Sequence, residues 1–84
     1  MKNYVYILEC SDKTLYTGTT RNLDKRVREH NGTGAGAKYT KGRRPVKLVY
    51  VETCHTLSVA LKREAAIKRL SRAKKLLLIA LRHG

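Results

Sequence analysis

The chain has 84 residues, fewer than the ~100–200 usual for one domain, so we expect a single domain over residues 1–84. Its longest apolar run, Leu76 to Leu81, is far shorter than the ~20 residues that span a bilayer. The first residues lack the apolar segment of a signal peptide. These features exclude an integral membrane protein, and we expect a cytoplasmic location.

Charge is the strongest compositional signal. Nineteen Lys and Arg residues against six Asp and Glu residues give a net charge of +13. Residues 1–31 carry +2 of this charge, and residues 32–84 carry +11. A field of this sign attracts a polyanion. Nucleic acid fits best, because each Lys or Arg near a phosphate releases counterions, and an anionic membrane surface is the weaker alternative.

The two cysteines, Cys10 and Cys54, form neither a C-x-x-C pair nor a zinc-binding spacing. We expect both to be buried as small apolar side chains in a reducing compartment. The sequence therefore indicates neither a structural metal cluster nor a disulfide framework.

A β-hairpin is predicted near the start of the chain. The aromatic and β-branched run from Tyr4 to Leu8 indicates one strand, and residues 14–17 indicate a second, which Gly18 ends. Ser11-Asp12-Lys13 is typical of a turn. Two strands joined by so short a link form an antiparallel hairpin.

A helix is predicted after the hairpin. Asn22 can cap its N-terminus, and Asn31-Gly32 is a usual signal for its C-terminal end. Leu23 and Val27 are four positions apart, so both should lie on its buried face.

A Gly-rich loop over residues 32–37 separates this helix from a third strand. The strand follows Pro45 and runs from Val46 to Val51. Its nearly continuous apolar character favours a central position in the sheet, covered on both faces.

Two further helices are predicted. Thr56 or Ser58 can cap a helix that runs to about Leu70 and buries Leu57 and Leu61. The last helix starts at Arg72, after Ser71 as its cap, and runs to about Arg82. Its expected inward-facing residues are Leu76, Leu77, Ile79 and Ala80. The order β-β-α-β-α-α predicts an α+β fold with a three-stranded antiparallel sheet flanked by helices.

Five side chains in these elements can carry chemistry, namely Tyr6, Tyr16, Arg26, His30 and Glu64. The two tyrosines lie on paired strands across a short turn, which can bring both phenols to one face of the sheet. Arg26 and His30 are four positions apart on the predicted helix. Taken singly, each residue has an ordinary structural interpretation: packed tyrosines, solvated helix side chains and an ion pair at Glu64.

Taken in order, these residues resemble the GIY-YIG nuclease superfamily. The matching segments are Tyr4-Val5-Tyr6, Tyr16-Thr17-Gly18, Asn22 to Asn31, Lys62 to Lys68 and Ser71 to Lys75. The resemblance covers essentially the whole chain, whose length is similar to that of the small stand-alone bacterial members. It implies hydrolysis of phosphodiester bonds with a single divalent cation, Mg²⁺ or Mn²⁺.

The resemblance also implies individual roles. The implied catalytic residues are Tyr6, Tyr16, Arg26, His30 and Glu64, and Gly18 closes the second motif. Arg26 would grip the scissile phosphate with its forked guanidinium, and Glu64 would hold the cation, since Mg²⁺ needs few protein ligands. Either Tyr16 or His30 would be the general base. A phenol has an ordinary pKa of about 10 and an imidazole one of about 6.5, so only a phenol needs its pKa lowered.

The sequence departs from the family pattern at three places. Tyr4 stands where the family name has Gly, and Thr17 stands where it has Ile. No Asn follows Asn31, although some larger members place a late asparagine in the site. The substrate preference of those members therefore does not carry over, whereas the arginine and the cation ligand are retained.

Two basic clusters are candidate phosphate contacts. The loop cluster consists of Lys38, Lys41, Arg43 and Arg44, and the helical cluster of Lys68, Arg69, Arg72, Lys74 and Lys75. The alternative is scattered solvated charge. Phosphate contacts position a nucleic acid without reading its bases, so we expect weak sequence preference.

The sequence therefore predicts a metal-dependent DNA endonuclease of repair or processing, selective for structure rather than sequence and without a nucleotide cofactor. Two alternatives stay open: a non-catalytic DNA- or RNA-binding module, and a nuclease subunit that needs a protein partner for specificity. Glu64 favours the enzyme, because a bare carboxylate in the site would repel phosphate.

Overall fold

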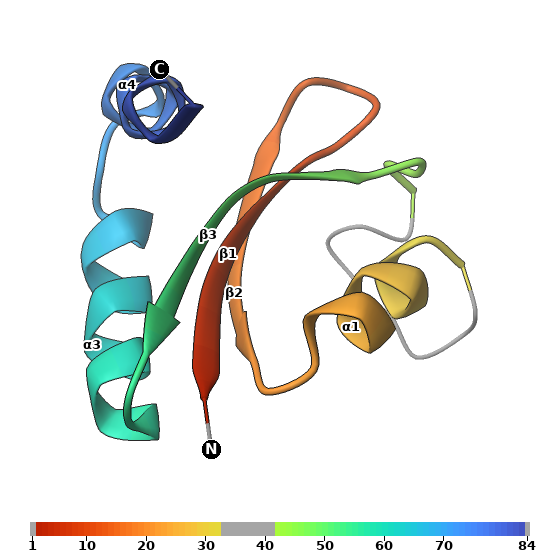
Figure 1. The fold of residues 1–84 in the computed structure, drawn as a ribbon. Helices are drawn as coiled ribbons and strands as arrows, with labels where there is room; N and C mark the ends of the chain where they lie inside the picture. The colour runs from red at the N-terminus through yellow and green to blue at the C-terminus, as the bar shows by residue number, and fades with distance from the viewer. Residues whose placement is uncertain (1, 33–41, 84) are drawn as a thin grey trace.

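The computed structural model describes residues 2–32 and 42–83, and the side chains up to Leu81. The strands are β1 (Asn3–Glu9), β2 (Leu15–Thr20) and β3 (Lys47–Cys54), and the helices are α1 (Leu23–His30), α3 (Leu57–Lys68) and α4 (Arg72–His83). The predicted order β-β-α-β-α-α and the α+β class are confirmed. Figure 1 shows α1 on one side of the sheet and α3 with α4 on the other.

The sheet is antiparallel with the strand order β2-β1-β3. The expectation of a central third strand is therefore wrong, because β1 holds the central position and β3 lies at an edge. The physical reason is burial on both faces: Val5, Ile7 and Leu8 are completely buried, whereas β3 exposes Lys47 and Leu48. A register shift between Ile7 and Leu8 interrupts the pairing of β1 with β3.

Strand β2 does not end at Gly18, as the sequence pattern predicted, but continues to Thr20. Gly18 pairs with Tyr6, and Thr20 pairs with Tyr4, so the hairpin is longer than expected. The turn before it is as predicted. Asp12 accepts hydrogen bonds from the backbone N–H (3.1 Å) and the hydroxyl (2.6 Å) of Thr14.

Two apolar layers cover the two faces of the sheet. Against α3 and α4, the buried cluster comprises Val5, Ile7, Tyr50, Cys54, Ala60 and Ile67. Against α1, it comprises Tyr6, Leu8, Cys10 and Val46, with Leu23 and Val27 packed on it. Both cysteines are buried and free, as expected. Within the described residues, no helix has the length and apolarity needed to cross a membrane.

The predicted buried stripes of the last two helices are partly wrong. Helix α3 buries Ala60 and Ile67 and leaves Leu57 and Leu61 about half exposed. Its sheet-facing side also carries Arg63, which donates from Nε to both carboxylate oxygens of Glu52 on β3 at 3.0 and 2.9 Å. An ion pair with the sheet thus forms part of the contact between α3 and the sheet, where the spacing of apolar residues alone predicted leucine packing.

The inward-facing side predicted for helix α4 is also partly wrong. Leu78 and Ile79 pack on the core, whereas Leu76 and Leu77 are exposed. Ala80, also expected to face inward, is exposed as well. A run of consecutive apolar residues does not indicate which side of a helix meets the sheet, and the packing of α4 against β3 decides it.

Asn31 fastens the end of α1 to the start of β3. Its Oδ1 accepts from the backbone N–H of Val46 (2.7 Å), and its Nδ2 donates to the carbonyl oxygen of the same residue (3.0 Å). The next residue, Gly32, has φ +127°, a conformation that favours glycine, so the helix ends where the sequence predicts. These two hydrogen bonds resemble those between paired strands, and they hold the end of α1 against the sheet.

We expect Asn31→Ala to lower the free energy of unfolding by about 1–3 kcal/mol, because it leaves a buried backbone N–H and C=O without partners. Urea denaturation monitored by circular dichroism measures this change. A variant as stable as the wild type would contradict the fastening role of Asn31.

Candidate functional site

The two tyrosines named by the sequence share one face of the sheet. In the β1–β2 pairing Tyr6 lies opposite Gly18, and Leu8 lies opposite Tyr16. Because side chains alternate along a strand, all four positions face α1. The ring centroids of Tyr6 and Tyr16 are 6.3 Å apart, with the ring planes tilted by 37°. The spacing argument from the sequence is therefore confirmed.

Gly18 makes room for the ring of Tyr6. A Cβ atom at position 18 would lie 2.5 Å from the phenol oxygen of Tyr6 and 2.7 Å from Cζ. No side chain can occupy that space unless the tyrosine moves. The glycine of the second motif therefore allows the tyrosine of the first motif to lie flat across the neighbouring strand.

Helix α1 brings Arg26 and His30 to the same phenol. Asn22 caps this helix by accepting from the backbone N–H of Lys25 (3.1 Å), which fixes where its first turn begins. Nε2 of His30 is 3.0 Å from the phenol oxygen of Tyr6, and the His30 ring centroid is 4.9 Å from that of Tyr16.

The guanidinium of Arg26 also hydrogen-bonds the phenol of Tyr6. Its Nη1 donates to the carboxylate of Glu29 one helical turn further on, at 3.1 Å. The guanidinium is thus held between a phenol on the sheet and a carboxylate on its own helix.

Electrostatics assign the protons of this group. Burial, opposed by the hydrogen bond from Arg26, raises the pKa of Tyr6 to about 12, so the phenol keeps its proton. Burial and then the charge of Arg26 lower the pKa of His30 below its ordinary value, so the imidazole is neutral. The phenol oxygen accepts from Arg26 and shares a hydrogen bond with Nε2 of His30, whose direction follows from the tautomer of the imidazole.

Glu64 reaches this region from the other side of β2. Its Oε1 accepts from the hydroxyl of Thr19 (2.7 Å), and its Oε2 pairs with Nζ of Lys68 (2.8 Å), one turn along α3. Burial alone would raise the pKa of Glu64, but the bonds from Lys68 and Thr19 outweigh it and hold that pKa below its usual range. The carboxylate is therefore ionised at neutral pH.

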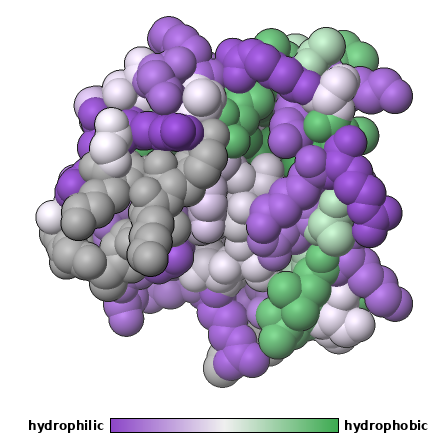
Figure 2. Space-filling view, turned by 180° about the vertical axis from the view of Figure 1, so that it is seen from behind, coloured by the Kyte–Doolittle hydropathy of each residue, from purple (hydrophilic) through white to green (hydrophobic). Residues whose placement is uncertain are grey.

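An open cleft of about 300 Å³ connects these groups around the edge strand β2. Its lining residues are Asn3, Tyr6, Tyr16, Gly18, Thr19, Thr20, Arg21, Arg26, Leu57, Leu61 and Glu64. In Figure 2 a pale surface lies near the centre, with hydrophilic side chains and an apolar patch beside it. His30 is only 1% exposed and lies behind the tyrosines rather than in the cleft wall.

The cleft suits a hard divalent cation by its donor chemistry. Carboxylate, hydroxyl and phenol oxygens line it, and these are oxygen ligands of the kind that Mg²⁺ takes. Among residues 2–32 and 42–83, no three His, Cys, Asp or Glu side chains gather into a metal-binding group. A cation here would rely on Glu64, which is sufficient for Mg²⁺ because it keeps several waters and uses substrate phosphates.

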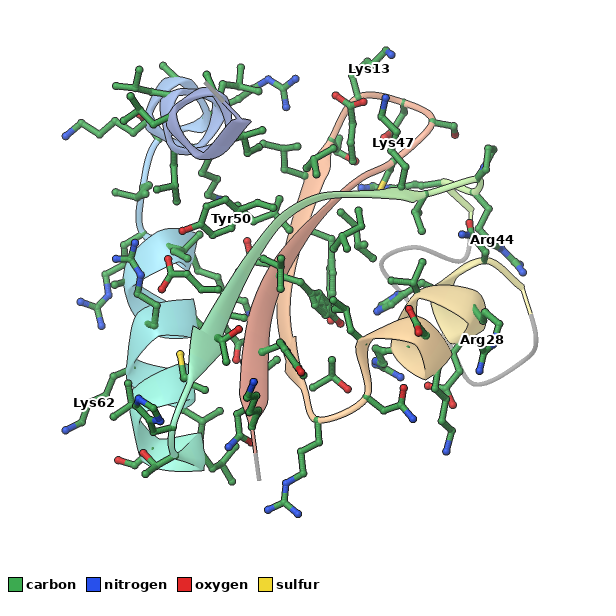
Figure 3. All side chains as sticks on the ribbon, in the orientation of Figure 1. Lys13, Arg28, Arg44, Lys47, Tyr50 and Lys62 are labelled. Atoms are coloured by element: carbon green, nitrogen blue, oxygen red, sulfur yellow. The ribbon has the colours of Figure 1, made fainter. Side chains whose placement is uncertain are left out.

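The two basic clusters lie apart. Lys38 and Lys41 fall outside the described residues. Arg43 pairs with Asp12 beside the hairpin turn, with Nε and Oδ2 3.5 Å apart, and Arg44 lies near the end of α1 (Figure 3). Arg69, Arg72, Lys74 and Lys75 belong to the other side of the sheet, with α3 and α4 (Figure 1). Lys68 differs from them because it pairs with Glu64 at the cleft.

Several cleft residues were not predicted, above all Thr19, Arg21 and Asn3. Thr19 escaped notice because the sequence pattern ended the strand at Gly18. The strand in fact continues for two residues. Because side chains alternate along a strand, Thr19 points to the face that α3 covers, whereas Gly18 belongs to the face that α1 covers. Asn3 escaped notice because nothing in the sequence indicates that the first residue of a strand lines a cleft.

We expect Gly18→Ala to displace Tyr6 and to lower the free energy of unfolding by about 1–3 kcal/mol through overpacking. Thermal denaturation and the near-ultraviolet circular dichroism of the tyrosines report the two effects. Gly42→Ala is the matched control, since within the described residues, apart from its chain neighbours, no atom lies within 4 Å of a Cβ at that position. Equal behaviour of the two variants would contradict the close approach at Gly18.

His30 gives stability a pH dependence. Its pKa is lowered in the folded protein, so on acidification the unfolded chain takes up this proton first. The free energy of unfolding should therefore be highest above pH ~6.5 and fall as the pH drops from there toward the folded pKa. Urea denaturation at several pH values measures this slope.

His30→Gln should flatten the slope, and His55→Gln, at an exposed site, should keep it. An unchanged slope in His30→Gln would show that another group causes the dependence.

Comparison with known proteins identifies relatives of this chain. Residues 2–76 match the protein-family model described as "GIY-YIG catalytic domain". A UPF0213 protein of Syntrophus aciditrophicus is 69% identical over 78 residues, which cover 93% of this chain and 90% of that protein. A UPF0213 protein of Clostridium perfringens is 58% identical over 78 residues, covering 93% and 83%.

Two solution NMR structures are also similar. The UPF0213 protein of Bacillus halodurans has a TM-score of 0.65 at 45% identity and covers 100% of this chain and 88% of its own. A protein of E. faecalis has a TM-score of 0.68 at 39% identity, covering 99% and 88%. Neither name states an activity or a substrate.

Proposed function

Because the chain belongs to the GIY-YIG family, we propose that it is a metal-dependent endonuclease that hydrolyses phosphodiester bonds in DNA. The observation that carries this proposal is one cleft lined by a guanidinium, a phenol and an ionised carboxylate, from Arg26, Tyr16 and Glu64. These are the groups needed to bind a phosphodiester, remove a proton from water and hold a cation. We place its work in DNA repair or processing.

Arg26 is the residue that grips the scissile phosphate. Its guanidinium is partly exposed in the cleft, and Tyr6 and Glu29 hold it in place. A forked donor matches two phosphate oxygens and stabilises the negative charge that grows as water attacks phosphorus. Lysine at this position would keep the charge and lose the fork.

Glu64 is the residue that holds the divalent cation. When bound, a cation here supplies charge neutralisation for the phosphate and for the leaving oxygen. Thr19 keeps the carboxylate directed into the cleft through its hydroxyl, and Lys68 offsets its charge.

Exposure separates the two candidates for the general base. Tyr16 lines the cleft, where water can reach it. His30 is buried, and its Nε2 is already hydrogen-bonded to the phenol of Tyr6. We therefore assign proton abstraction to the phenol oxygen of Tyr16. Tyr6 and His30 act as positioning residues, because they hold the guanidinium and pack against the Tyr16 ring.

The basic residues outside the cleft bind the sugar-phosphate backbone. Arg69, Arg72, Lys74 and Lys75 belong with α3 and α4, and Arg43 and Arg44 lie beyond the end of α1. Contacts of this kind orient a strand without reading bases. The substrate preference that follows is one of nucleic-acid structure rather than sequence, with a protein partner as a further source of specificity.

We expect Mg²⁺-dependent cleavage of labelled DNA at low salt, and loss of that cleavage in Arg26→Ala and Glu64→Ala. Each substitution removes a group that acts on the developing charge, so the rate should fall about 10²–10³-fold. The assay compares single-stranded, duplex, flapped and branched DNA with one RNA.

Arg28→Ala is the matched control, because Arg28 belongs to the same helix and extends away from the sheet (Figure 3). It removes the same charge and should keep nearly the full rate. Cleavage by Glu64→Ala at the wild-type rate would overturn the role of that residue. Tight binding without any cleavage by the wild type would instead favour a binding module.

A further inference from the structure

The cleft extends beyond the groups that the proposed reaction uses. Past Glu64 it continues between the ends of β1 and β2 and the first turns of α3, where Asn3, Arg21, Leu57 and Leu61 line it. None of these four side chains has a role in gripping the phosphate, holding the cation or moving the proton. This second part of the cleft therefore has room for another part of the substrate.

Asn3 is unusual among the residues of this wall. Its side chain is 4% exposed, and its Oδ1 has no hydrogen-bond partner within the described part of the chain. A buried amide oxygen without a partner destabilises a fold, so such atoms are rare in stable proteins. The oxygen itself is closed off from solvent, so a ligand in the cleft can supply a donor only if the Asn3 side chain turns toward it.

The opposite wall is apolar. Leu57 and Leu61 are 46% and 49% exposed, although they stand at a spacing that normally buries a helix face. Figure 2 shows the apolar patch that the start of α3 forms beside the pale surface of the cleft. Leucine side chains can cover the face of a flat ring, and an amide can bond its polar edge. A nucleobase combines these two features.

We infer that Asn3, Leu57 and Leu61 form a subsite for the base of the nucleotide next to the phosphate at Arg26 and Glu64. The inference rests on the proposed function, because it takes the occupant to be part of the same strand. Arg21 and Arg26 both line the cleft, so each part of the cleft has a positively charged guanidinium for the sugar-phosphate backbone of the substrate. A base can enter only after leaving its stack, so substrates with an unpaired nucleotide beside the cut are preferred.

The test is a binding measurement that involves no cleavage. Fluorescence anisotropy in EDTA compares a flapped DNA, whose junction fixes the binding register, with copies in which an abasic spacer replaces one nucleotide of the flap at a time. For the wild type, the spacer at one position should weaken binding by about tenfold, and at other positions far less. Wild-type affinity that is insensitive to the spacer at every position would overturn the subsite.

Leu61→Ser should weaken binding of the intact strand by about fivefold to tenfold and abolish the positional effect of the spacer. Val59→Ser is the matched control, since Val59 is 52% exposed on the same helix and does not line the cleft. It should bind like the wild type. Equal loss in both variants would overturn the assignment, because it would indicate a general apolar contact or a protein-docking face.

Asn3→Val separates a ligand-binding role from a structural one. It removes the unpaired oxygen, so we expect a melting temperature no lower than that of the wild type together with weaker binding of the intact strand. Unchanged binding, or binding and melting temperature that fall together, would overturn the role of Asn3. If binding depends on the position of the spacer but no Mg²⁺-dependent cleavage occurs, the subsite is supported and the proposed endonuclease activity is contradicted.

Discussion

The ring of Tyr6 lies across Gly18 on the neighbouring strand, and the arrangement of the site depends on this contact. With no side chain at position 18, the phenol can reach Nε2 of His30 and accept from Arg26. Two residues of α1 are thereby joined to the sheet through one oxygen atom. The ring of Tyr6 fills the space that a side chain at position 18 would take, so one glycine positions the phenol at the cleft.

The edge position of β2 allows the two faces of the sheet to contribute to one site. Tyr16 and Arg26 belong to the face that α1 covers, whereas Glu64 comes from α3 on the opposite face. If β2 were a central strand, a neighbouring strand on each edge would separate the groups on one face of the sheet from those on the other. Consecutive residues of α3 secure the arrangement: Arg63 binds Glu52 on β3, and Glu64 binds Thr19 on β2. The helix is thus held to both edge strands, and the carboxylate is fixed at the cleft.

Local sequence signals were sufficient for the elements, whereas the grouping of the site residues followed from the resemblance to the GIY-YIG superfamily. The cap at Asn22, the stop at Asn31-Gly32 and the hairpin turn are short-range features, and the structure has each of them as predicted. Strand order and helix orientation are not local, so the central place of β1 and the exposure of Leu57 were not predictable from spacing. Because polar contacts hold the inner side of α3, hydrophobic periodicity misidentified that side.

The charge of the protein and the chemistry of its cleft come from different halves of the chain. Residues 32–84 carry +11 of the net charge of +13, yet most of the cleft wall comes from β1, β2 and α1. A long-range field raises the local concentration of any polyanion and does not distinguish one strand from another. At the proposed reaction site, by contrast, two charged groups of the cleft are balanced by neighbours, Arg26 by Glu29 and Glu64 by Lys68. Discrimination must therefore arise where charge is locally balanced, from the shape of the cleft and from uncharged groups such as the amide of Asn3.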